Sequence, residues 1–230
     1  EASDRRANGL AGLGVRSLDA VGIFLPPTPE AVVAVMACSK LGAVWLPLFS
    51  GFGADAVAKR LEDAQAKVLI TADGFPRRGK VVPMKETADE AVASAPSVRH
   101  VVVVDRIGRR DTHWDLERDL HWDDLLAAHA DRFETARLDP EHPLFIAYTS
   151  GTTGRPKGAV HVHGGFLVKI AEEVAFQFDC RPGDRLFWFT DLGWMMGPWA
   201  IAGALLLDAS LVIYEGAPDF PGPDRLWEIV

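Results

Sequence analysis

The residues best suited to chemistry form one short run, residues 148–158. The run reads Tyr-Thr-Ser-Gly-Thr-Thr-Gly-Arg-Pro-Lys-Gly and follows an apolar segment that predicts a buried strand. Glycines allow backbone N–H groups to approach phosphate oxygens, hydroxyls add small donors, and a lysine adds a positive charge. Together these residue types predict a loop that binds a polyphosphate; a flexible surface turn is the alternative. The residues expected to hold the phosphates are Thr149, Ser150, Gly151, Thr152, Thr153, Gly154, Lys157 and Gly158.

The run is not a Walker A loop, which places Gly-Lys-Ser/Thr after four variable positions. Pro156 occupies the place of the second glycine of that motif. A different run, 74–80, has the Walker A spacing, but Val81 replaces the Ser/Thr that would bind Mg²⁺, and Pro83 interrupts the helix expected next. We therefore interpret it as a compact basic patch, either a solvated turn or a phosphate-binding site. Its cations are Arg77, Arg78 and Lys80.

Strand-like and helix-like segments alternate along the chain, which predicts βα units and a mostly parallel sheet. The loops that follow parallel strands gather at one edge of the sheet, so that edge is expected to carry the function. The charge-dense stretch 105–121 is expected to be a surface excursion. Strands are expected at 20–25, 43–48, 67–71, 98–104, 144–149, 185–189 and 211–214. Helices are expected at 5–13, 29–41, 54–64, 85–95, 165–178 and from 226 onward.

Composition excludes several classes of protein. The 230 residues carry a net charge of −8, so a broad basic face for nucleic acid is not expected. Cys38 and Cys180 form no CxxC, which argues against a disulfide scaffold or a cysteine zinc site and favours the reducing cytoplasm. The uncharged run 192–207 is slightly short for a membrane span and is broken by glycines and a proline. His161 and His163 have no adjacent carboxylate, so no metal site is predicted.

The run 148–158 resembles the phosphate loop of the adenylate-forming superfamily, which includes acyl-CoA synthetases, luciferases and peptide-synthetase adenylation domains. The superfamily pattern is Ser/Thr-Ser-Gly-Ser/Thr-Thr-Gly-x-Pro-Lys-Gly, and every position is met. Residues 191–194, Asp-Leu-Gly-Trp, are similar to the second core motif of the superfamily. Residues 49–52 and 70–73 are most similar to the acetyl-CoA synthetase branch. The resemblance covers nearly the whole chain.

This resemblance implies an α/β fold, with parallel sheets sandwiched by helices, as in the large N-terminal domain of adenylate-forming enzymes. It further implies that the domain is incomplete. Residues 1–164 would form a first lobe that includes the phosphate loop 148–158, and residues 165–230 would begin a second lobe. The mobile C-terminal domain with its lysine would be absent. We therefore expect a fragment that offers no catalytic residue of its own and is inactive alone.

The reaction implied by the resemblance has two steps and uses ATP, Mg²⁺ and coenzyme A. A carboxylate attacks the α-phosphate to give an acyl-adenylate, and the coenzyme A thiol then displaces AMP. Arg77 and Lys80 would lie near the 3′-phosphate of coenzyme A. The acyl pocket would be lined by Trp194, Met195 and Met196, although each of these is also compatible with simple packing. Met195 and Met196 replace the Val-Thr that usually follows this tryptophan in the acetate branch, and Gly-Trp-Met-Met is more similar to acetoacetyl-CoA synthetases. The resemblance thus favours a short-chain or 3-oxo acid over a long fatty acid and does not single out acetate.

Two other functions remain open. The first is an adenylating domain that loads a carrier-protein thiol. The basic patch at Arg77 and Lys80 argues for free coenzyme A instead, because a carrier brings no 3′-phosphate. The second is a non-catalytic nucleotide-binding module. In the preferred interpretation the partners are small molecules only, namely a carboxylate, ATP and coenzyme A.

Overall fold

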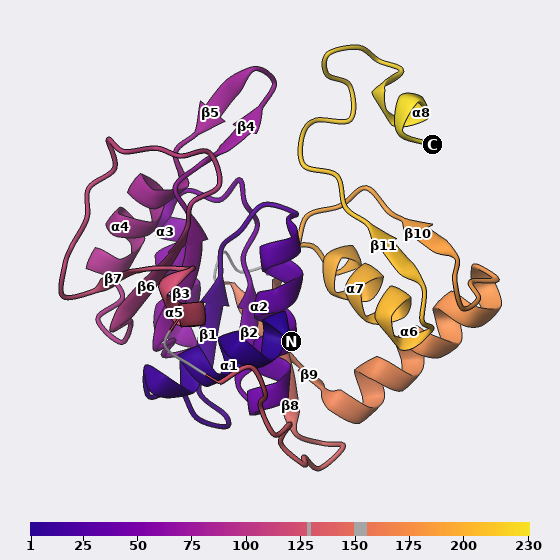
Figure 1. Cartoon of the computed structure of the whole chain (residues 1–230), viewed down its shortest axis with the longest axis horizontal. Helices are drawn as coiled ribbons and strands as arrows, with labels where there is room; N and C mark the ends of the chain where they lie inside the picture. Colours follow the sequence, from indigo (N-terminus) through magenta and orange to yellow (C-terminus); the bar gives the residue numbers. More distant parts are fainter. Residues whose placement is uncertain (128–129, 150–155) are drawn as a thin grey trace.

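A seven-stranded sheet forms the centre of the protein (Figure 1). A computed structural model describes residues 1–127, 130–149 and 156–230. The strand order is β7-β6-β3-β1-β2-β8-β9, with parallel neighbours everywhere except the antiparallel pair β8–β9. The mostly parallel α/β sheet predicted from the sequence is therefore confirmed. Its strands are β1 (Ala20–Ile23), β2 (Val44–Pro47), β3 (Val68–Ala72), β6 (His100–Val104), β7 (Asp119–His121), β8 (Pro143–Thr149) and β9 (Lys157–Val162).

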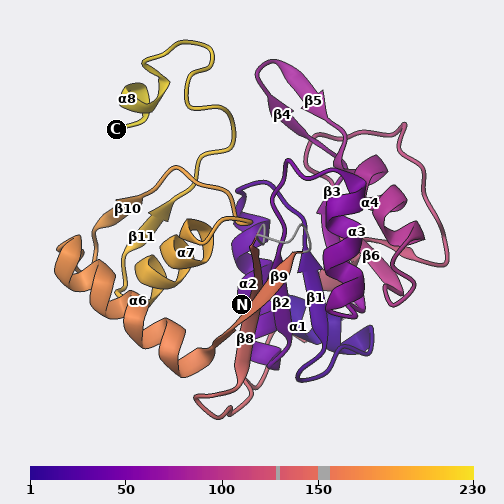
Figure 2. The ribbon, with the colours of Figure 1, turned by 180° about the vertical axis from the view of Figure 1, so that it is seen from behind.

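Helices cover both faces of this sheet. The chain leaves β1 through α2 (Pro29–Leu41) to β2 on one side, and leaves β2 through α3 (Ala54–Asp63) to β3 on the other side. Because crossovers between parallel strands are right-handed, α2 and α3 lie on opposite faces. α1 (Ala2–Gly12) packs on α2, seen at the front of Figure 1, and α4 (Met84–Ala93) packs beside α3, which is at the front of Figure 2.

The bounds of α2 follow from its sequence. Pro29 occupies the first position, where its missing N–H has no intrahelical partner. Gly42 ends the helix with φ 73°, a left-handed conformation that favours glycine, and its N–H donates to the carbonyls of Cys38 and Ser39. The predicted helix at 29–41 is confirmed.

A smaller layer lies beside the main sheet (Figure 1). It consists of the parallel pair β10 (Arg185–Phe187) and β11 (Ser210–Val212), joined by α7 (Met196–Leu206). α6 (His163–Gln177) packs on α7, and the contact is close because a Cβ at Gly203 would lie 2.5 Å from Cγ2 of Val174. α8 (Arg225–Ile229) closes the described chain. Among the described residues, every helix is too short or too polar to cross a membrane. The boundary of the two lobes at residue 164 stays a prediction.

The run with Walker A spacing is part of a β-hairpin formed by β4 (Phe75–Arg77) and β5 (Lys80–Val82). Arg78 and Gly79 form its two-residue turn with φ 50° and 72°, and two positive φ angles are what a type I′ turn requires. The rejection of a Walker A loop is therefore confirmed.

The stretch 105–121 was expected to be an excursion only, but its last three residues form β7 at the edge of the sheet, and α5 (Asp124–Ala127) follows. Buried ion pairs hold this edge. The ammonium of Lys85 contacts Asp119 at 2.8 Å and Asp89 at 2.7 Å, and the side chain of Lys85 has no exposed surface. Arg118 contacts both carboxylates. A strand of three residues is too short to show an alternation of apolar and polar side chains. The ion pairs that hold it involve Lys85 and Asp89 of the distant helix α4, so the local sequence does not predict this strand.

Candidate functional site

The topology predicts where a ligand should bind. The loops after the adjacent strands β1 and β2 lead to helices on opposite faces of the sheet. Such a reversal opens a crevice at the carboxyl ends of the two strands. A cavity of about 260 Å³ lies there, with Pro27 after β1 and Phe49 after β2 among its walls. The expectation that one edge of the sheet collects the functional loops is thus supported by a cavity at that edge.

The small sheet supplies the opposite wall. Phe189 and Thr190 follow β10, and Gly216 lies in the segment after β11. The carboxyl ends of both sheets therefore face one cavity. Its lining residues are Pro27, Phe49, Arg77, Phe189, Thr190, Asp191, Trp194 and Gly216.

Asp191 joins the two walls. The hydroxyl of Ser50 donates to Oδ2 of Asp191 at 2.5 Å, and the N–H groups of Ser50 and Gly193 donate to Oδ1 at 3.3 and 2.9 Å. Burial raises the pKa of Asp191 above its usual range, while these hydrogen bonds and the charge of Arg77 oppose the rise. The carboxylate is therefore a buried acceptor whose described donors come from both loops.

Trp194, predicted to line the acyl pocket, lies on the cavity with its ring centroid 5.3 Å from that of Phe49. The residue before it must be glycine, because a Cβ at Gly193 would overlap the backbone N and Cα of Phe49. Met195 is partly exposed, and Met196 begins α7 and packs against the core. Neither methionine is among the described residues that line this cavity.

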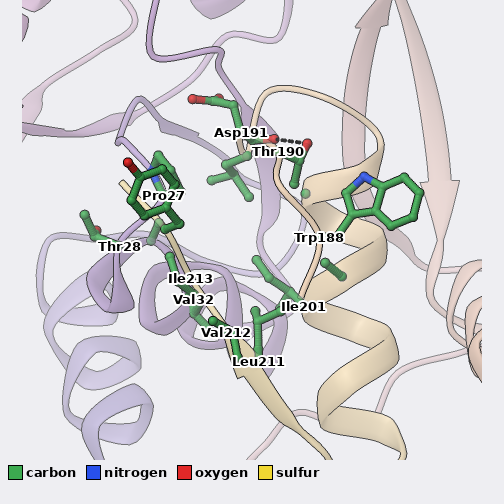
Figure 3. A pocket seen from close by; sticks show the side chains of 15 residues that line it. Pro27, Thr28, Val32, Trp188, Thr190, Asp191, Ile201, Leu211, Val212 and Ile213 are labelled. Carbon is green, nitrogen blue, oxygen red and sulfur yellow. Dashed lines mark hydrogen bonds between the residues drawn. The ribbon is translucent and has the colours of Figure 1, made fainter. Parts of the chain in front are cut away.

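A smaller cavity of about 40 Å³ lies next to the first, with Asp191 and Pro27 in both walls. Figure 3 shows Pro27 and Thr28, at the start of α2, facing the loop that carries Thr190 and Asp191.

The three cations of the β4–β5 hairpin differ in whether a carboxylate pairs with them. Arg77 and Lys80 are directly opposite each other, so their side chains share one face, and like charges in that position repel. Arg78 is instead paired with Asp219 at 2.7 Å. In the described part of the chain no carboxylate pairs with Arg77 or Lys80, and this arrangement suits an anion. The structure places Arg77, but not Lys80, on the cavity that Trp194 also lines.

The predicted phosphate loop joins the two strands of an antiparallel ribbon. Thr149 at the end of β8 is directly opposite Lys157 at the start of β9, so the hydroxyl and the ammonium share one face at the carboxyl edge of the sheet. Ser150 to Gly154 lie outside the described residues. At Gly158 a Cβ would lie 2.8 Å from Cγ2 of Ile146, so packing within the ribbon requires this glycine.

The ribbon is tied to α3 by Tyr148. Its hydroxyl donates to Oδ2 of Asp63 at 2.7 Å, and the guanidinium of Arg60 lies 5.7 Å from the centroid of its ring. Burial and the carboxylate of Asp63 raise the pKa of Tyr148 well above its usual range, so the phenol stays protonated. This contact holds the C-terminal end of β8 against α3.

His161 and His163 do not share a face. His161 lies in β9 and stacks on Phe145 with a centroid distance of 4.4 Å, whereas His163 begins α6 and lies 5.8 Å from His142. Burial lowers the pKa of both residues, so both rings are neutral near pH 7. The described residues contain no group of three or more His, Cys, Asp or Glu side chains arranged to hold a metal ion.

Sequence reasoning did not identify Ser50, Asp191 or Gly216 as site residues. Asp191 opens the 191–194 motif and Ser50 lies within the 49–52 loop, so both motifs were noticed. Their hydrogen bond could not be predicted from either motif, because the two residues are 141 positions apart.

Comparison with known proteins agrees with this architecture. A family model described as "AMP-binding enzyme" matches residues 1–230. The chain is 47% identical over 232 residues to an acetyl-coenzyme A synthetase of Methanothrix thermoacetophila, and 45% identical over 228 residues to one of Streptomyces coelicolor. These alignments cover 100% and 98% of this chain but 35% of each relative. The chain therefore spans about a third of the length of these curated relatives.

A solved structure, the acetoacetyl-CoA synthetase from Streptomyces lividans, is also similar. The TM-score is 0.90 at 36% identity, and the superposition covers 99% of this chain and 35% of the other. The α/β fold expected for the large domain of adenylate-forming enzymes is thereby confirmed. With its whole length matched by the family model and its fold shared with a solved relative, the chain belongs to the AMP-binding enzyme family.

Proposed function

We propose that this chain is part of an ATP-dependent acyl-CoA synthetase that activates a short-chain carboxylate as acyl-AMP and transfers it to coenzyme A. One observation carries the proposal. The run 148–158 begins at the end of β8, and β8 is the neighbour of β2 in the sheet; the loop after β2 lines the cavity between the two sheets. ATP phosphates and a carboxylate could thus meet at one edge of the sheet. The named relatives are acetyl- and acetoacetyl-CoA synthetases, which supports the same reaction class.

In the first step a carboxylate oxygen bonds to the α-phosphorus, and pyrophosphate leaves with the electron pair of the broken bond. Negative charge grows on the departing pyrophosphate. Donors fixed in advance at that position lower the barrier. Thr149 and Lys157, side by side at the end of the ribbon, are proposed to hold the β- and γ-phosphates together with residues 150–154 and Gly158. A carboxylate is already nucleophilic, so no general base is required.

In the second step the coenzyme A thiol attacks the acyl carbon and AMP leaves. The unpaired charges of Arg77 and Lys80 are proposed to hold the 3′-phosphate, and Lys80 acts there as a point charge. Trp194, on the same cavity as Arg77, is proposed to contact the acyl group. Met195 and Met196, which follow it in the chain, are proposed to complete the acyl pocket. Mg²⁺ is expected to accompany ATP. The described residues contain no group of three or more His, Cys, Asp or Glu side chains that could hold a metal ion, and no protein ligand is assigned to it. We also propose a cytoplasmic location, which the two free, buried cysteines support.

Acid-dependent exchange between ATP and labelled pyrophosphate tests the first step. In the full-length protein we expect exchange with one of acetate, propionate, butyrate or acetoacetate. Replacing Lys157 with alanine should lower the exchange rate roughly 10²-fold, because one preorganised donor to the pyrophosphate is lost. Lys169→Ala is the control, since Lys169 is an exposed cation on α6. Absence of exchange with every acid, or an unchanged rate in Lys157→Ala, would contradict the proposal.

The basic hairpin provides a test of the second step. The double change Arg77→Ala and Lys80→Ala should raise KM for coenzyme A roughly tenfold or more, because charge-assisted hydrogen bonds contribute about 1.5–3 kcal/mol each. KM for ATP and for the acid should stay unchanged. Arg78→Ala is the matched control, because its guanidinium is already paired with Asp219. Equal effects in the double variant and the control would argue for a merely solvated turn.

A further inference from the structure

Buried hydrogen bonds join the loop after β2 to the loop after β10 at one wall of the cavity. Ser50 donates to Asp191 from both its hydroxyl and its backbone N–H, and Gly193 adds a third donor. Ser50 and Asp191 are 2% and 8% exposed. Breaking these hydrogen bonds would leave buried polar atoms without a partner, which is unfavourable. The two residues therefore set the separation of the two loops.

Two aromatic rings on this wall lie close to that pair in the sequence. Phe49 precedes Ser50, and Trp194 follows Gly193. The two rings lie 5.3 Å apart and both line the cavity. Gly193 also lies directly against the backbone of Phe49, so the two loops are in close contact. A change at Ser50 or Asp191 is transmitted to both rings.

The position of the cavity indicates which step depends on it. Arg77, from the hairpin proposed to bind coenzyme A, lines this cavity. Of the described residues in the phosphate ribbon, namely Thr149 and Pro156 to Gly158, none lines it. Because Arg77 and Trp194 both line it, the space suits the meeting of an acyl group with a thiol arm.

We propose that Asp191, paired with Ser50, is a positioning residue for the transfer of the acyl group to the thiol, and that it acts through geometry and not through its charge. In that step the sulfur bonds to the acyl carbon, the bond between that carbon and the AMP oxygen breaks, AMP keeps the electron pair, and the thiol proton passes to water. Phe49 and Trp194 must be in place for this attack. The proposal rests on the acyl-CoA synthetase function.

Three variants of the full-length protein separate geometry from charge. Asp191→Ala removes both hydrogen bonds between the loops, and Ser50→Ala removes the shorter one, which the hydroxyl donates. Asp191→Asn keeps both, because the amide oxygen accepts the two backbone N–H groups and the amide nitrogen donates to the Ser50 hydroxyl. We expect kcat/KM for coenzyme A to fall on the order of tenfold or more in both alanine variants and to stay within about twofold in Asp191→Asn, since small displacements of reacting groups are costly. Pyrophosphate exchange should fall less than thioester formation in both alanine variants, because exchange does not require the attack of the thiol.

The outcomes are distinguishable. If wild type shows no acid-dependent exchange, the proposed function fails before the positioning role is tested. If wild type is active and the alanine variants lose exchange and thioester formation equally, Asp191 supports the whole fold and the positioning role is wrong; the thermal midpoint of each variant checks this. If Asp191→Asn is as impaired as Asp191→Ala, the charge is required and the geometric account is overturned. Unimpaired alanine variants would overturn it as well.

Discussion

Replacing Lys85 with methionine is expected to lower the free energy of unfolding by about 3–5 kcal/mol, because breaking a buried ion pair leaves an uncompensated charge. The Lys85 ammonium contacts Asp119 and Asp89 and donates to the carbonyl of His113 at 3.0 Å, and neither Lys85 nor Asp119 has exposed side-chain surface. We expect the lower end of the range, since Arg118 still reaches Asp119 at 2.7 Å. The midpoint of urea unfolding measures the loss.

Lys59→Met is the matched control. Lys59 also pairs with an aspartate one helical turn away, Asp55, but both side chains are more than half exposed. Exposed pairs contribute little, so a loss below about 1 kcal/mol is expected. Equal losses in the two variants would show that burial does not govern this cluster.

The pH dependence of the Lys85 effect has a definite sign. Burial alone would raise the pKa of Asp119, but the hydrogen bonds from Arg118 and Lys85 lower it below the usual value of 3.8. A carboxyl whose pKa is lower in the folded state stabilises the fold above its unfolded pKa, and that contribution is lost as pH falls through the folded value. The difference between wild type and Lys85→Met should therefore be full at neutral pH and shrink below about pH 4.

Replacing Gly193 with alanine is expected to reduce thioester formation about 10²-fold in the full-length protein. A Cβ at this position would overlap the N and Cα atoms of Phe49 and lie 2.7 Å from the carbonyl carbon of Leu48. These are backbone atoms and cannot rotate away, so the two loops must separate. Separation lengthens the hydrogen bonds to Asp191 and moves Trp194 from Phe49, and a displacement of about 1 Å can cost a hundredfold in rate. Steady-state kinetics with coenzyme A measure the loss.

Gly165→Ala is the control variant, because it replaces a glycine by alanine where there is room for the added Cβ. Gly165 lies in the first turn of α6, and an added Cβ would meet only Cγ2 of Val162 at 3.5 Å, an ordinary contact. Rates should be unchanged, with a small gain in stability from the better helix former. Wild-type rates in Gly193→Ala would mean that the two loops are not rigidly coupled.

The parallel core was predictable because each buried strand is a continuous apolar run bounded by turn residues. Helix α7 was not predicted, since Met196–Leu206 is apolar on every side and begins with Gly197 and Pro198. A helix that is apolar on every side has no amphipathic stripe. Pro198 fits because it lies in the first turn, where an N–H has no intrahelical partner. Strand β9 was not predicted either, because its pairing with β8 defines it and its own sequence shows no clear apolar run.

The site was partly predictable. Arg77 and Trp194 were chosen from separate motifs, and the structure brings both to one cavity. The run 74–80 alone does not show that Arg78 pairs with Asp219, because an ion pair between residues 141 positions apart depends on the fold. The same holds for Ser50 and Asp191. The roles of the methionines and of the phosphate loop stay predictions.

The cavity walls come from widely separated parts of the chain, from Pro27 to Gly216. Contacts of high sequence separation close late in folding, because the entropy of the intervening loop opposes them. Synthesis from the N-terminus proceeds at about 5–20 residues per second. The 139 residues that follow Arg77, up to and including Gly216, therefore take roughly 7–28 seconds to appear. During that interval the first strands can pair while the cavity does not yet exist, so a nascent chain acquires its ligand site only after both sheets have formed.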